Sequence, residues 1–205
     1  MKKSLLLLFI TFSFSAFSQI RQQSSTEGFR VGLQVGRTGW ASDYFSFVST
    51  NAGSGFTIGA NASYGINQLI EPYVGYEYSS MGTGTVNVSS FSFSHIDAGV
   101  RFNFGGTVNK LRPFVQAGYG IRNGSLTQIS FATGGFGNVN FNGATPHIGG
   151  GVSYFIKPNL ALHAKGVATF GSKASVLVNN TDFGEKADVT TFRLTVGVSF
   201  NLSDL

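Results

Sequence analysis

The chain has 205 residues, with 28 glycines, 21 phenylalanines, no cysteine and only 11% charged residues. Without cysteine, disulfides, thiolate metal sites and a lipid-modified N-terminal cysteine are excluded. The net charge of +5 is not gathered into a basic stripe, so we expect no nucleic-acid partner.

Residues 1–18 have the pattern of a secretory signal peptide. Lys2 and Lys3 precede an apolar stretch, and the small residues Ala16 and Ser18 stand before Gln19. The apolar stretch is shorter than the roughly 20 residues that a spanning helix needs, which makes a membrane anchor the weaker alternative. We expect cleavage after Ser18 and a flexible lead-in over residues 19–27.

Eight segments alternate apolar residues with polar residues or glycine, as β-strands with two different faces do. In the last segment, Phe192, Leu194 and Val196 alternate with Arg193 and Thr195. The predicted strands cover residues 29–36, 56–66, 69–78, 95–104, 112–121, 146–156, 160–170 and 191–202.

The predicted connections alternate between long and short along the chain. The long ones cover residues 39–55, 79–90, 122–143 and 171–188. Transmembrane barrels have this asymmetry, with short periplasmic turns and longer outer loops, whereas a soluble eight-stranded ligand carrier has no need of it. We therefore predict an all-β protein, an eight-stranded antiparallel up-and-down transmembrane β-barrel over residues 28–202, followed by a tail over residues 203–205.

The four strands that run into a short turn or the C-terminus end alike. Each places an aromatic residue two positions before an apolar residue at its end. These aromatics are Tyr64, Phe102, Tyr154 and Phe200. Because they share the outward parity, they predict a ring at one height, as a periplasmic membrane-interface girdle requires. The opposite girdle would consist of Tyr78, Tyr119, Phe170 and Phe192.

With these repeated strand ends, the chain resembles the small eight-stranded outer-membrane β-barrels of the OmpA/OmpX type, in a stand-alone form without a periplasmic domain. The resemblance implies a place in the outer membrane of a Gram-negative-type bacterium, contact with outer-membrane lipid and insertion by the barrel assembly machinery. It also implies that Phe200 is the aromatic which that machinery recognises. The family residue is usually terminal, whereas residues 201–205 follow it here. We expect a monomer.

Eight charged residues take the inward parity of the predicted strands. They are Arg30, Glu71, Glu77, Asp97, Arg101, Arg112, Lys165 and Arg193. An eight-stranded barrel is just wide enough for side chains to fill it, so these charges must pair or meet water. If Gly75 pairs with Asp97, Glu71 falls opposite Arg101, and the next hairpin brings Arg112 near Asn103. We predict an ion-pair cluster toward the periplasmic end, which acts either as a structural plug, the favoured interpretation, or as part of a gated, ion-selective pore.

No catalytic, cofactor-binding or metal-binding motif is evident. Glu71 and Glu77 stand about 20 Å apart along one strand, too far apart to act as a pair. His147 is the candidate for a lipid-modifying esterase, but Gly149 occupies the position where its face would need a serine. We predict that the protein is not an enzyme.

The predicted connection over residues 122–143 contains two short alternating runs around Gly134 and Gly135. This pattern predicts a hairpin that continues past the membrane. Its open edge could accept a strand from a surface partner, or the hairpin could only shield the barrel mouth. The expected function is therefore a structural or surface-interaction role with a filled polar lumen, and the alternative is a narrow channel for ions or small solutes.

Overall fold

The computed structural model describes residues 22–83, 88–130 and 136–203. The predicted signal peptide, most of the residues around Gly134 and the last two tail residues lie outside this part. Eight antiparallel strands pair in sequence order and close into a ring, which confirms the predicted up-and-down barrel. They are β1 (Gly28–Ala41), β2 (Ser54–Gly65), β3 (Ile70–Met81), β4 (Ser90–Asn103), β5 (Leu111–Ser130), β6 (Phe136–Lys157), β7 (Leu160–Val178) and β8 (Thr181–Asn201).

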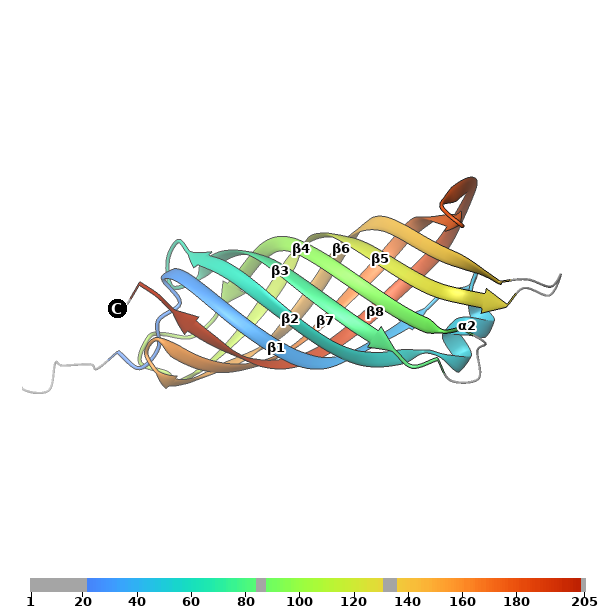
Figure 1. Ribbon diagram of the computed structural model, residues 1–205. Coiled ribbons are helices and arrows are strands. Elements are labelled where there is room, and N and C mark those ends of the chain that lie inside the picture. Colours follow the sequence, from blue (N-terminus) through green and yellow to red (C-terminus); the bar gives the residue numbers. More distant parts are fainter. Residues whose placement is uncertain (1–21, 84–87, 131–135, 204–205) are drawn as a thin grey trace, which may run out of the picture.

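The barrel has two different ends, visible in Figure 1. One end, here called the turn end, carries the connections β2–β3, β4–β5 and β6–β7 together with the C-terminus. The other, here called the loop end, carries the short helix α2 (Ser46–Asn51) and the β5–β6 and β7–β8 hairpins. In the described part of the chain, no helix has the length and apolar character needed to cross a membrane.

The register between β3 and β4 is the one that the sequence predicts. Gly75 lies opposite Asp97, and Glu71 lies opposite Arg101. Because side chains alternate between the faces of a strand, this register sends all four residues into the lumen. In the next hairpin Asn103 lies opposite Phe114, and Arg112 is two positions away and donates to Phe104 O at 3.3 Å, near Asn103 as predicted.

The strict alternation of long and short connections is wrong, because two of the predicted long loops are mostly strand. β5 continues to Ser130, and β6 already begins at Phe136. Only Asn179 and Asn180 join β7 to β8. Both asparagines have positive φ, 49° and 64°, as a two-residue type I′ hairpin turn requires. The predicted extended hairpin over 122–143 is confirmed for its described strands.

The lead-in also differs from the prediction, since its described part is packed and not loose. Ser24, Ser25 and Thr26 are buried. The backbone N–H of Ser24 donates to Thr107 O at 3.0 Å, and Thr26 Oγ1 donates to Gln68 O at 2.8 Å. This segment therefore covers the turn end of the lumen.

The polarity of the two barrel faces inverts part of the way along the strands. On β4, Phe93 faces the lumen while Ser94 faces outward, but two residues later His95 faces the lumen and Ile96 faces outward. Toward the loop end the barrel is thus apolar inside and polar outside, and toward the turn end it is polar inside and apolar outside. The same change occurs on β5, β6, β7 and β8, and on β1 the inward Trp40 joins the apolar interior.

Candidate functional site: the filled lumen

Side chains fill the lumen in four successive layers. The inward residues of β3 contribute to each layer and so show the order of the layers along the barrel. From the turn end, Glu71, Glu77, Ser79 and Met81 each belong to a different layer. We call the layers the turn-end cluster, the central cluster, the hydroxyl layer and the apolar plug.

The turn-end cluster consists of Glu71 with Arg30 and Arg101. Glu71 Oε1 lies 3.2 Å from Arg101 Nη1, and Glu71 Oε2 lies 3.6 Å from Arg30 Nη1. Ser63 and Asn103 donate further hydrogen bonds to this carboxylate, at 2.6 and 2.8 Å. A buried carboxylate is stable only with such a complete set of partners.

Arg112, predicted to lie near Asn103, forms a separate cap at the turn end. Its Nη1 donates to Thr26 Oγ1 and Gln68 Oε1, both at 3.0 Å, and its Nη2 donates to Gln68 O. Among the described residues it has no carboxylate partner, so it ties the lead-in and the β2–β3 turn together rather than joining the ion pairs.

The central cluster contains Glu77, Asp97, Lys165 and Arg193, from four different strands. Arg193 Nη1 contacts Glu77 Oε2 at 2.9 Å and Asp97 Oδ2 at 2.7 Å, and Lys165 Nζ contacts Glu77 Oε1 at 3.1 Å. Gly59 leaves room for this arrangement, because a Cβ there would lie 2.7 Å from Glu77 Cγ. The sequence predicted a single cluster near one end, whereas the lumen holds two.

A tyrosine and a histidine that the sequence did not assign to the lumen network extend the central cluster. Tyr73 Oη lies 2.6 Å from His147 Nε2, and His147 Nδ1 lies 3.7 Å from Asp97 Oδ1. His147 is buried inside the barrel. It therefore does not face lipid at the outer wall, where the catalytic histidine of a lipid-modifying esterase would have to lie. Its inward parity on β6 is the signal that could have placed it.

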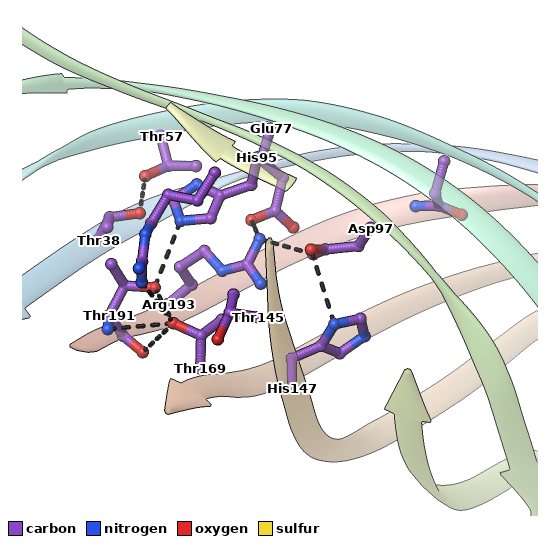
Figure 2. A network of polar contacts seen from close by, with 12 residues as sticks. Thr38, Thr57, Glu77, His95, Asp97, Thr145, His147, Thr169, Thr191 and Arg193 are labelled. Carbon is purple, nitrogen blue, oxygen red and sulfur yellow. Dashed lines mark hydrogen bonds and ion pairs between the residues drawn. The ribbon is translucent and has the colours of Figure 1, made fainter. Parts of the chain in front are cut away.

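The hydroxyl layer lies between the central cluster and the apolar plug, and Figure 2 shows its threonines beside the central cluster. Thr38 Oγ1 lies 2.7 Å from Thr57 Oγ1, and Thr169 Oγ1 lies 2.6 Å from Thr191 Oγ1. His95 Nε2 joins Thr191 Oγ1 at 3.3 Å. Arg122, another inward cation beyond the predicted end of its strand, donates to Val189 O at 3.0 Å.

The apolar plug fills the lumen toward the loop end. Trp40 stacks with Phe141 at a ring-centroid distance of 5.9 Å and contacts Phe93 at 5.4 Å. Trp40 Nε1 donates to Ala52 O at 2.9 Å, which ties the segment after α2 onto the plug. The buried members are Trp40, Val48, Ala52, Met81, Phe91, Phe93, Leu126, Val139, Phe141, Ala174, Val176, Ala187 and Val189.

The predicted girdle residues lie on the outer wall near the turn end. Tyr64, Phe102 and Tyr154 are exposed, and Phe200 is partly exposed. Their partners across the sheet include Phe29, Ile70 and Leu162, which also face outward. The residue types are those of an interface belt, and the place of these residues at a membrane surface stays a prediction.

The lumen carries more positive than negative charge. Six buried cations, Arg30, Arg101, Arg112, Arg122, Lys165 and Arg193, stand against three buried carboxylates, Glu71, Glu77 and Asp97. Within the described residues, no group of three His, Asp or Glu side chains could hold a metal ion. The lumen is thus built of ion pairs, hydroxyls and packed rings.

Comparisons with known proteins agree with this architecture. The sequence matches the outer membrane protein beta-barrel domain family over residues 4–200. A search of curated proteins found no match.

Two solved barrels share the fold at low sequence identity. Neisserial surface protein A has a TM-score of 0.62 and 21% identity, over 86% of this chain and 98% of its own. Ail, the attachment invasion locus protein of Yersinia pestis, has a TM-score of 0.51 and 16% identity, over 85% of this chain and 100% of its own. The family match covers nearly the whole chain, and the resemblance seen in the strand ends is confirmed. The chain belongs to the outer-membrane protein β-barrel family.

Proposed function

We propose that the mature protein is a sealed outer-membrane barrel whose role is structural or lies in contacts at the cell surface. In this proposal residues 1–18 direct export and are removed, the apolar band around the turn-end half of the barrel meets lipid, and the loop end faces outward. Family membership and the exposed apolar residues of the outer wall support this placement.

The observation that carries the proposal is the apolar plug. Phe93, Leu126 and Phe141 are 0% exposed inside the loop-end half of the barrel, in one cluster with Val48 of α2. A packed apolar cross-section leaves no polar path for ions, and protein interiors of this kind contain few voids larger than water. The charged layers below it then stabilise the wall by joining strands across the lumen.

The surface role is supported by the part of the barrel that extends beyond the polarity inversion. Its outward residues are polar, as in Asn123, Asn140, Lys173 and Asp188. Among the described residues, the pairing of β8 with β1 ends at Thr190, opposite Ala41, so residues 181–189 have no strand partner on that side. Such an edge is able to pair with a strand of another protein. The same fold occurs in proteins named for a neisserial surface and for attachment and invasion.

A narrow channel is the second candidate, and the excess of positive charge in the lumen is the observation that favours it. A pore with this lining would prefer anions. It would require the apolar plug to move aside, since the rings around Trp40 close the loop end.

Two experiments on the unmodified barrel test the proposal. In a liposome-swelling assay with a small sugar, vesicles that contain the barrel should swell no faster than empty vesicles. A peptide tag inserted between Asn179 and Asn180 should be detected by antibody on intact cells. Rapid swelling would contradict the sealed lumen, and a tag that is accessible only after lysis would contradict the orientation.

A further inference from the structure

One charged side chain stands on the outer wall, and its two partners across the sheet, Phe56 and Leu194, are apolar. Arg37 on β1 is exposed and has the outward parity of Leu33 and Val35. In the described strands it is the sole charged residue at an outward position between the two aromatic girdles. A charge facing lipid is costly and marks a functional position by default.

Arg37 lies close to the outer aromatic girdle. It pairs with Leu194 on β8 and Phe56 on β2, and the next outward pair on the β8 side joins Gly39 with Phe192. Its Nη2 donates to Ser54 Oγ at 3.1 Å, and it forms no ion pair with another described residue. The guanidinium is therefore held near the membrane surface without a carboxylate partner.

A groove on the outer wall begins at this arginine. It has a volume of about 430 Å³ and is lined on its outward side by Val35, Gly150, Ala164, Gly166 and Leu194. The wall is hollowed here because glycine and alanine stand where other strands carry large side chains. This volume is in the range of roughly 300–1,000 Å³ found for small-molecule sites.

The groove continues toward the turn end. A second hollow, of about 730 Å³, shares Val35, Ala164 and Val196 with the first and reaches Leu33 and Val198. From Arg37 to Leu33 the path is about 13 Å at 3.3 Å per residue. The two hollows together therefore form an apolar track with a cation at its outer end.

From this arrangement we infer that the wall of β6, β7, β8 and β1 binds one phosphate-bearing lipid of the outer leaflet. Arg37 holds the phosphate, because the fork of N–H donors on its guanidinium suits that group. An acyl chain lies along Val35, Ala164 and Val196. The inference rests on the proposed membrane placement, and the matching of cation to anionic headgroup and of apolar track to acyl chain selects this occupant.

The test uses the full barrel in nonionic detergent, with diphosphorylated lipid A as the probe and native mass spectrometry as the readout. One molecule of lipid A should remain bound per barrel. Arg37→Gln should weaken binding about tenfold or more, as expected for the loss of a charge-assisted hydrogen bond, and Arg37→Lys should weaken it less. Dephosphorylated lipid A should bind the unmodified barrel as weakly as lipid A binds Arg37→Gln.

The groove is tested by a matched pair of substitutions at exposed alanines. Ala164→Trp fills the track and should displace the lipid, whereas Ala98→Trp on the far wall, at β4, should leave binding unchanged. Folding of each variant is checked by its heat-dependent shift in gel mobility.

Equal binding by Arg37→Gln and the unmodified barrel, or equal loss in the two tryptophan variants, would overturn the inference. Inorganic phosphate that competes fully with lipid A would overturn it as well, because a free anion would then be the ligand. None of these results would disturb the sealed, surface-exposed barrel, which the swelling assay and the surface tag test independently.

Discussion

Arg193 on β8 reaches across the lumen to Glu77 on β3, with 2.9 Å between Nη1 and Oε2. Both side chains are buried, and the two residues are 116 positions apart in the chain. This contact joins opposite parts of the ring, so the central cluster connects strands that do not pair with one another.

Glu77→Gln should destabilise the barrel by about 3–5 kcal/mol, because it leaves the buried Lys165 and Arg193 without one of their carboxylates. The free energy of unfolding in urea, measured in lipid vesicles, checks this value. Glu185→Gln, at an exposed carboxylate on β8, serves as the control and should change stability by less than about 0.5 kcal/mol. Equal effects in the two variants would show that the cluster contributes little.

Val196→Arg should cost about 2–4 kcal/mol, because the exposed side chain lies in the middle of the wall that we propose to face lipid. Thr190→Arg, on the same face of the same strand but beyond Phe192, should cost about 0–1 kcal/mol. Refolding titrations of both variants in vesicles provide the comparison. If both substitutions were equally harmless, the lipid-facing assignment of this wall would be wrong.

Asn180→Ala should destabilise the β7–β8 hairpin by about 1–2 kcal/mol, since its φ of 64° is unfavourable for alanine. Asn180→Gly should be neutral or stabilising, because glycine adopts this conformation readily and Asn-Gly is the preferred type I′ sequence. Thermal or urea unfolding distinguishes the two, and a glycine variant less stable than the alanine variant would contradict the turn assignment.

Phe200→Ala should lower the amount of barrel assembled in cells more than it lowers refolding into vesicles. The expected reason is that Phe200, near the end of the last strand, is recognised by the assembly machinery. Phe192→Ala, at the other end of β8, controls for the loss of an aromatic side chain from the outer wall. A matching decrease in assembly for both variants would remove any special role for Phe200.

The fold could be predicted from the sequence because the alternation of polar and apolar residues has the period of a strand and repeats eight times. The pairing of Gly75 with Asp97, assumed in the prediction, is the one observed, and it brings Glu71 opposite Arg101 as expected. The strand-end aromatics likewise indicated which side faces outward, since they share one parity.

The β5–β6 extension could be predicted as a hairpin, but the apolar interior of the loop-end half and the extension of β7 and β8 could not, because they exchange the faces on which apolar residues lie. In residues 139–142, apolar and polar positions alternate as regularly as in the membrane band, but with the faces exchanged. Val139 and Phe141 face a packed interior there, and Asn140 and Asn142 face outward. This inversion of faces is the sequence signal for the extension of β7 and β8 and for the apolar plug.

The contacts of the central cluster could not be predicted, because they join strands that are not neighbours in the ring. Arg193 meets Glu77 and Asp97 across the lumen, and this depends on barrel curvature and on side-chain reach rather than on pairing. The packed lead-in was missed for a similar reason, since Thr26 gains its partners only after the turn end has formed.

The ionic current through the unmodified barrel in a planar lipid bilayer tests the sealed lumen most directly. With an open porin as the positive control in the same bilayer, the barrel should add no steady current above that of the bare membrane. A large and long-lived conductance that appears on each insertion would contradict the account, because the apolar plug around Trp40 and Phe93 would then not close the lumen.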